Sequence, residues 1–147
     1  MEKLVILGKG PRSISLKQIK SQGYKIWTVG TFDDPEDCLV DRFYEWHGLH
    51  YKNRNMHREY PEYLKKSVLP LNNSICNMLL IAYHEGYKDV VILGAPMELT
   101  EEYRVEKPAL IYCIGYLNAL GMNISYDQIP KSKRYGENSE KRLLAKE

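Results

Sequence analysis

The stretch LVILGKGPRS, residues 4–13, decides the fold that we predict for this chain. The strand predicted over 3–7 contains an apolar run of four residues, 4–7, typical of a buried strand, and Gly8 ends it. Gly8 and Gly10 would let the backbone approach a bound phosphate, while the first N–H groups of a following helix face the anion. Two interpretations therefore stay open: a strand that delivers a phosphate-binding turn, or a strand-to-helix turn whose glycines serve geometry alone.

The turn matches no standard nucleotide motif in full. Gly8 and Gly10 fit the first half of the dinucleotide fingerprint, but Ser13 stands where the third glycine belongs. No acidic residue ends the second predicted strand, because Asp33 and Asp34 come after it in a polar turn. A P-loop is excluded, since no Gly-Lys-Ser/Thr sequence follows the glycines. A standard NAD site is therefore not indicated, and we predict no cofactor.

A looser phosphate site can still be built from this turn. In that interpretation Pro11 or Arg12 begins the helix, and the helix N–H groups face the anion. Lys9 and Arg12 would add positive charge beside it. We predict that the Arg12 side chain points at the ligand phosphate.

Strand-like and helix-like segments alternate along the chain, which predicts a single three-layer α/β domain with a mostly parallel, Rossmann-like sheet. We expect strands over 3–7, 24–29, part of 38–46, 88–94 and 122–126. We expect helices over 13–22, over 57–66, from Asn73 or Ser74 to a stop at Gly86, and over 106–121 with Pro108 in its first turn. The domain would span residues 1–126, followed by a basic tail over 127–147 that is mobile or an interaction arm.

Composition restricts the class of protein. The chain has 147 residues, of which 44% are hydrophobic and 27% charged, and a net charge of +2, as in an ordinary soluble globular domain. This charge is too small to predict nucleic-acid binding, and no apolar run is long enough for a membrane span. The three cysteines form no C-x-x-C pair, and no leader-like segment precedes the first strand, so we expect a cytoplasmic protein. Twelve tyrosines suit a ligand site or an interface between subunits.

Two pairs of polar residues are candidates for contacts at strand or helix ends. Asn73 and Ser74 open a helix, where N-capping is the favoured interpretation and contact with a base, ribose or phosphate is the alternative. Glu45 and His47 end the third predicted strand, two residues apart and therefore on one face, so they could act as an acid/base pair. A polar strand terminus is the favoured interpretation for this second pair.

The remaining histidines and the central segment carry weaker signals. We predict no metal site, because no metal-ligand spacing relates His50, His57 and His84. The segment 48–72 mixes lysines and arginines with tyrosines. A solvated loop and helix face is favoured there, and a lid that stacks a tyrosine on a bound base is the alternative.

Two separated stretches together resemble a known enzyme family. VILGKGPRS is similar to the glycine turn of the Rossmann-like bacterial sialyltransferases, and NNSICNMLLIAYHEGYKDVVILGAPM is similar to a second segment of the same family. In that family the two stretches form the cytidine-nucleotide pocket. The resemblance implies nucleotide contacts at seven positions, namely Gly8, Lys9, Gly10, Pro11, Ser13, Asn73 and Ser74.

Over residues 3–126 the chain also resembles a group of small Rossmann-like proteins common in bacteriophage genomes. The shared features are the glycine turn, an aromatic-His ending of the third strand, and a helix with the pattern E-Y…P…Y-x-I-G-Y, here Glu102, Tyr103, Pro108, Tyr112, Gly115 and Tyr116. The departures from the sialyltransferases are Lys9 for asparagine, the insertion of Arg12, Asn73 for threonine, and the loss of an acid after Gly94. The chain is also too short for that family's lid and catalytic histidine.

These features lead to three functional hypotheses. The first is a nucleotide-binding protein, phage-encoded, active in the host cytoplasm and homo-oligomeric, that sequesters a nucleotide-derived immune signal such as a cyclic nucleotide or an ADP-ribose derivative. His47 would be among its ligand contacts. The second is a nucleotide-dependent transferase or a hydrolase of a nucleotide messenger, with Glu45 and His47 as acid/base candidates. The third is a structural or partner-binding protein in which the fold is vestigial.

Overall fold

The computed structural model describes residues 2–30, 34–46, 56–71, 73–95 and 101–126. Six strands form one sheet in the order β4-β3-β2-β1-β5-β6, and every neighbouring pair is parallel. The strands are β1 (Lys3–Leu7), β2 (Tyr24–Val29), β3 (Arg42–Tyr44), β4 (Met56–His57), β5 (Asp89–Leu93) and β6 (Asn123–Tyr126). The chain builds outward from β1 to β4, then returns to the other side of β1 with β5. The strand order therefore reverses between β1 and β5.

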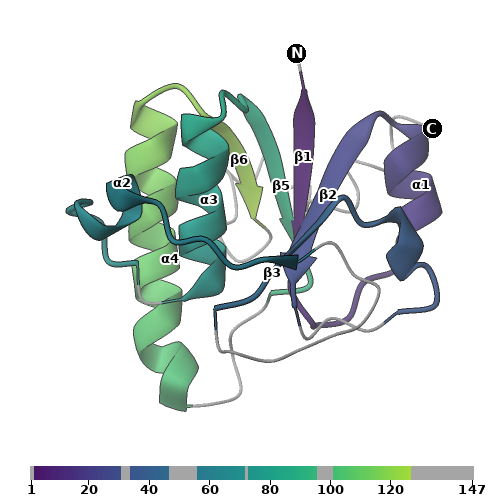
Figure 1. Cartoon of the computed structure of the whole chain (residues 1–147), viewed down its shortest axis with the longest axis horizontal. Helices are drawn as coiled ribbons and strands as arrows, with labels where there is room; N and C mark the ends of the chain where they lie inside the picture. Colours follow the sequence, from purple (N-terminus) through teal and green to yellow (C-terminus); the bar gives the residue numbers. More distant parts are fainter. Residues whose placement is uncertain (1, 31–33, 47–55, 72, 96–100, 127–147) are drawn as a thin grey trace, which may run out of the picture.

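Helices cover both faces of the sheet and make three layers (Figure 1). One face carries α1 (Leu16–Ser21) and the short 3-10 helix η1 (Asp37–Leu39). The other face carries α2 (Glu62–Lys65), α3 (Ser74–His84) and α4 (Glu101–Ala119), with α3 and α4 side by side. This arrangement confirms the predicted single α/β domain with a Rossmann-like parallel sheet.

The alternation of side chains along β1 explains why the sheet is covered on both faces. Leu4 and Ile6 are fully buried in the cluster beneath α3 and α4. Val5 and Leu7 are fully buried in the cluster beneath α1. A central parallel strand needs apolar residues at successive positions for this reason, and the run over 4–7 supplies them.

Most predicted elements are confirmed, with four differences. The helix predicted over 57–66 is shorter, since α2 covers only Glu62–Lys65. The strand β4 was not predicted, because it has only two residues, which pair with Phe43 and Tyr44 of β3. Helix α1 begins at Leu16, so the prediction that Pro11 or Arg12 begins it is wrong.

Helix α4 starts at Glu101 rather than at 106, and Pro108 lies inside it rather than in its first turn. A proline inside a helix removes one hydrogen bond. Burial of Leu110, Cys113 and Leu117 anchors α4 to the core and outweighs that loss. Within the described residues, no helix is long and apolar enough to cross a membrane.

Candidate functional site

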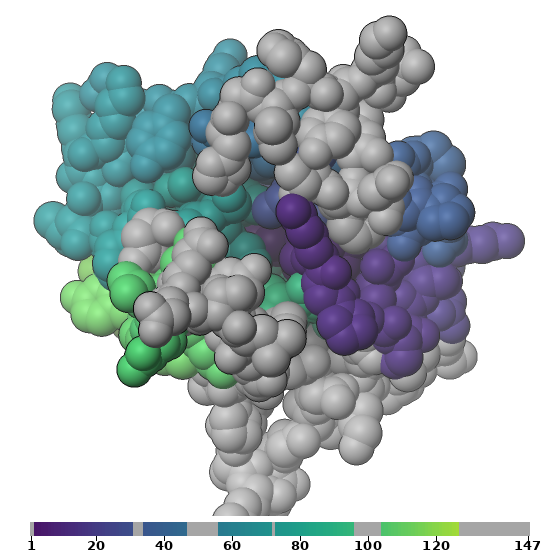
Figure 2. Space-filling model, turned by 90° about the horizontal axis from the view of Figure 1, so that it is seen from below, coloured from purple at the N-terminus to yellow at the C-terminus, as the bar shows by residue number. Residues whose placement is uncertain are grey.

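The candidate site lies at the edge of the sheet where the strands end, which we call the carboxyl edge. In open parallel sheets, ligands bind at this edge, where the strand order reverses. Here the reversal lies between β1 and β5, so the turn that follows Leu7 and the turn that follows Leu93 are neighbours. Figure 2 looks onto this edge, with the purple N-terminal residues on one side and the teal and green residues of α2, α3 and α4 on the other.

The two turns are joined by backbone hydrogen bonds. The Gly8 N–H donates to the Leu93 carbonyl over 2.8 Å, and the Gly10 N–H donates to the Gly94 carbonyl over 2.6 Å. Both N–H groups are therefore directed at β5 and its turn. If a phosphate binds here, it would need other donors, or would have to compete with these bonds.

The close approach of the turns also accounts for the glycines. A Cβ at Gly8 would lie 2.4 Å from the Gly94 carbonyl oxygen, and a Cβ at Gly94 would lie 2.9 Å from the Gly10 oxygen. Gly94 also has a φ of +67°, a conformation that favours glycine. Geometry alone is therefore sufficient to require glycine at positions 8 and 94. The phosphate interpretation of Gly8 and Gly10 stays a prediction.

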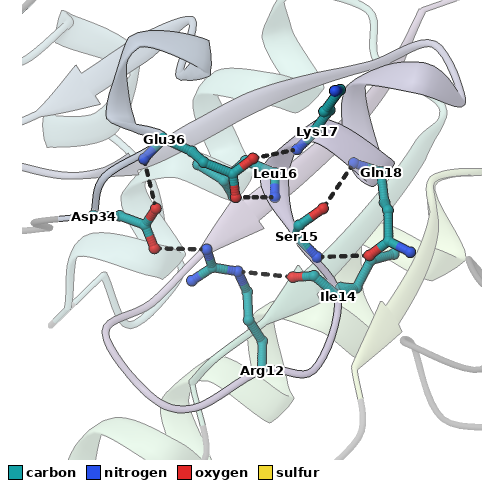
Figure 3. A network of polar contacts seen from close by, with 8 residues as sticks. All are labelled: Arg12, Ile14, Ser15, Leu16, Lys17, Gln18, Asp34 and Glu36. Atoms are coloured by element: carbon teal, nitrogen blue, oxygen red, sulfur yellow. Dashed lines mark hydrogen bonds and ion pairs between the residues drawn. The ribbon is translucent and has the colours of Figure 1, made fainter.

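The N-terminus of α1 is bonded to groups of this chain (Figure 3). The Glu36 carboxylate accepts from the N–H groups of Leu16 and Lys17 over 3.3 and 3.2 Å. Ser15 Oγ accepts from the Gln18 N–H over 3.1 Å, and the Gln18 side chain accepts from the Ser15 N–H, which completes a capping box. The first N–H groups of α1 therefore bond to Glu36 and Ser15, which corrects the expectation that they are free to face an anion.

Arg12 is turned toward the loop that follows β2 (Figure 3). Its Nε donates to the Ile14 carbonyl over 3.0 Å, and its Nη2 lies 2.8 Å from Asp34 Oδ2. The side chain is only 14% exposed, so it does not extend into bulk solvent. The hydrogen bond from Arg12 holds the pKa of the Asp34 carboxyl below its usual value. Contact of Arg12 with a phosphate stays a prediction, and such a contact would have to share the guanidinium with Asp34.

The other residues of the turn are accessible to solvent. Lys9, Pro11 and Ser13 are exposed. Lys9 therefore presents an ammonium group on the surface between the ends of β1 and α1. Among the predicted contacts in this turn, Lys9 needs the least rearrangement to meet an anion.

Asn73 is the N-cap of α3, as the favoured interpretation predicted. Its Oδ1 accepts from the Cys76 N–H over 3.0 Å, and its Nδ2 donates to the Glu106 carbonyl of α4 over 3.3 Å. The residue is 9% exposed. Ser74, the first residue of α3, is half-buried. Asn73 therefore joins the start of α3 to the second turn of α4, and both helices begin near the carboxyl edge (Figure 1).

Glu45 is buried at the end of β3. It is 2% exposed, and its N–H donates to the His57 carbonyl over 3.0 Å. A Cβ on Gly30 would lie 2.7 Å from Glu45 Cβ and 2.8 Å from Met56 Cε. Glu45 therefore packs against Gly30, which leaves room for it because glycine has no side chain. His47 lies outside the described residues, so the predicted Glu45–His47 pair cannot be placed.

His57 is a residue whose position the sequence did not reveal. It ends β4, and its ring lies 5.3 Å from that of Tyr44. Its Nε2 is buried and has no hydrogen-bond partner among the residues that the structure describes. Burial lowers the pKa of His57, which favours the neutral ring. The ring could have been placed at the carboxyl edge only if β4 had been predicted, and a two-residue strand has no recognisable sequence pattern.

Aromatic rings continue from His57 along the outer strands. The rings of Tyr44 and Trp46 stack with centroids 5.3 Å apart, and Trp46 meets Tyr60 edge-on at 6.3 Å. Trp46 Nε1 donates to the Glu59 carbonyl over 3.0 Å, which fixes its ring. Tyr60 is 38% exposed, so this row of rings reaches the surface.

Neither a metal site nor a similarity to known proteins assigns a function to this chain. Within the described ranges, no group of three His, Cys, Asp or Glu side chains could hold a metal ion. Comparison with family models, with curated proteins and with solved structures gave no match to this chain. Function is therefore inferred from the geometry of the carboxyl edge.

Proposed function

We propose that this chain is a cytoplasmic protein that binds a nucleotide or a nucleotide-derived small molecule at the carboxyl edge, over the junction of β1 and β5. The observation that carries the proposal is the reversal of strand order at this junction, which is where open parallel sheets bind their ligands. The resemblance to the sialyltransferase nucleotide pocket involves the same two stretches of chain, 5–13 and 72–97.

The charges at this edge favour an anionic ligand. Lys9 is exposed there, and the positive ends of the α3 and α4 dipoles point toward the same edge. Arg12 adds a second cation, partly neutralised by Asp34. In this proposal the phosphate contacts Lys9 and the start of α3 rather than the N-terminus of α1, which Glu36 occupies.

Binding without turnover is the form of the proposal that the side chains support best. A general acid or base must reach the ligand, yet Glu45 is 2% exposed and packs over Gly30. The alternative, a transferase or hydrolase, would require Glu45 to become exposed together with His47. We therefore propose sequestration of an intact ligand of the class expected from the sequence, a cyclic nucleotide or an ADP-ribose derivative.

The test separates binding from turnover. The full-length protein is incubated with cyclic mononucleotides, cyclic dinucleotides, ADP-ribose and cyclic ADP-ribose, freed of unbound ligand, and denatured by heat. We expect mass spectrometry to recover one of these compounds unchanged and near one equivalent per site. Recovery of a modified product would support the enzymatic alternative, and recovery of no compound would contradict both.

A further inference from the structure

Helix α4 presents a row of uncharged residues to solvent that the proposed ligand site does not use. We call this row the α4 stripe and define it as Val105, Pro108, Tyr112, Gly115 and Ala119, all exposed. Val105 is 65% and Tyr112 60% exposed. None of the exposed residues from 105 to 121 is charged, although 27% of the chain is. The opposite side of α4 packs on α3 and β6, so the stripe faces away from the core.

The spacing of the stripe is that of a helix-packing seam. Its members are separated by three, four, three and four residues, the repeat that keeps one line of side chains facing a partner helix. Ile111 and Tyr116 flank the line and are 39% and 42% exposed. A helix that faced only water would have no need of this repeat, and would carry charged residues along it.

Gly115 points to a close approach at the centre of the stripe. Glycine inside a helix is less favourable than alanine, because it leaves the unfolded chain more freedom. A Cβ at Gly115 would meet no atom within 4 Å, so nothing in the described part of the chain requires a glycine here. A second helix packed directly over this position would require it.

We propose that the α4 stripe is the interface of a homodimer, in which α4 packs antiparallel to α4 of a second copy about a two-fold axis between residues 113 and 114. This arrangement places Tyr112 over the partner's Gly115 and Pro108 against the partner's Ala119. Ile111 then meets the partner's Tyr116. The ring of Tyr112 thus faces a residue without a side chain, and the pattern is complementary to itself, as a two-fold interface must be.

The available area agrees with a dimer. The exposed apolar side chains of α4, together with Leu120, offer on the order of 500 Å² per copy, or about 1,000 Å² for the pair, where specific interfaces begin. An uncharged face also excludes a strongly acidic or basic partner, whose charges would be buried without compensation. A second copy of the same stripe meets both conditions.

Two substitutions test the dimer by sedimentation equilibrium of the full-length protein. We expect the wild type to have twice the 17.2 kDa chain mass at micromolar concentrations. Gly115→Leu, which has open space in the monomer, should raise the dissociation constant at least tenfold, and Tyr112→Glu should do the same. Lys17→Leu and Val68→Glu, exposed on other segments, are the matched controls and should leave the mass unchanged.

Circular dichroism shows whether a variant is misfolded, and all four variants should keep the wild-type spectrum. The proposal is overturned if the wild type sediments as a monomer, or if well-folded Gly115→Leu and Tyr112→Glu keep the wild-type mass.

The antiparallel direction has a test of its own. In a Cys38→Ser background, which removes an exposed thiol, a spin label is attached at Val105→Cys. Position 105 lies more than two turns from the two-fold axis, so the two labels should be on the order of 25 Å apart. A much shorter distance would mean that the helices are parallel and would overturn the proposed pairing.

Discussion

At the residue scale, the opening turn is held by backbone bonds to the turn after β5 and by an ion pair with the loop after β2. Gly8 and Gly94 are glycines because two backbone turns meet there, and a side chain on either would meet a carbonyl oxygen. Arg12 and Asp34 join the loops that follow β1 and β2. The polar groups of these two loops therefore bond mostly to each other, and among their described residues Lys9 offers the exposed charge.

Gly8→Ala tests the contact between the turns. The new methyl group would lie 2.4 Å from the Gly94 carbonyl oxygen, and backbone cannot move aside as a flexible side chain can. We expect the free energy of unfolding to fall by about 1–3 kcal/mol in urea denaturation. Lys9→Ala, at the exposed neighbouring position, is the control and should change it by less than about 0.5 kcal/mol. Equal effects of the two substitutions would contradict the account of Gly8.

Asp34→Asn tests the ion pair with Arg12. At pH 7 the variant should unfold with a free energy about 1–2 kcal/mol lower than the wild type, because a charge-assisted hydrogen bond is lost. The pKa of Asp34 is lowered in the folded protein, so this stabilisation exists above the ordinary value of 3.8 and disappears as the pH falls through the folded-state pKa.

The measurement is the urea midpoint of both proteins from pH 7 down to the acid limit of folding. The difference between them should shrink below pH 4. A difference that is constant with pH would show that the carboxylate charge of Asp34 does not stabilise the fold.

At the element scale, the sequence predicted the existence of strands and helices better than their ends. Continuous apolar runs predicted β1 and β5, and alternation of apolar and polar residues predicted β2. Gly86, with a φ of +91°, ends α3 as expected. The predicted start of α1 was wrong because the local sequence offers more than one residue that could begin the helix. The cap is Ser15, and Glu36, twenty residues away from Leu16, completes it. Sequence spacing alone cannot reveal such a tertiary cap.

Glu36→Ala tests this tertiary cap of α1. Removing the carboxylate leaves the Leu16 and Lys17 N–H groups without this acceptor and removes a negative charge from the positive end of the helix dipole. We expect a loss of about 0.5–2 kcal/mol in the free energy of unfolding, measured by urea denaturation. Glu62→Ala removes a carboxylate from a solvent-exposed ion pair, in which Glu62 Oε1 lies 3.5 Å from Lys65 Nζ. This substitution should lower the free energy of unfolding by less than about 0.5 kcal/mol. A loss for Glu36→Ala no larger than for Glu62→Ala would contradict the capping role.

At the scale of the whole molecule, the alternation of segments was enough to predict the parallel, three-layer fold, and the fold placed the candidate site. The sequence did not predict β4, so it left His57 at the start of a predicted helix rather than in a strand at the carboxyl edge. It also could not tell that Glu45 is buried, because a glutamate at a strand end has the same spacing whether it faces Gly30 or a ligand. These features depend on contacts between segments that are distant in sequence.

The central claim is that an anionic nucleotide-type ligand binds beside Lys9, at the carboxyl edge. The measurement is a thermal-shift panel with cyclic nucleotides, nucleoside mono-, di- and triphosphates, ADP-ribose and cyclic ADP-ribose. It compares the wild type with Lys9→Glu and with Lys88→Glu, an identical charge change just before β5, at the opposite edge of the sheet.

We expect at least one compound to raise the wild-type Tm by roughly 5–10 °C at a hundredfold excess over its Kd. Lys9→Glu should bind that compound ten- to a hundredfold more weakly, the loss of about 1.5–3 kcal/mol expected for a charged contact, while Lys88→Glu binds it as the wild type does. Equal binding by all three proteins, or no shift with any compound, would contradict the claim.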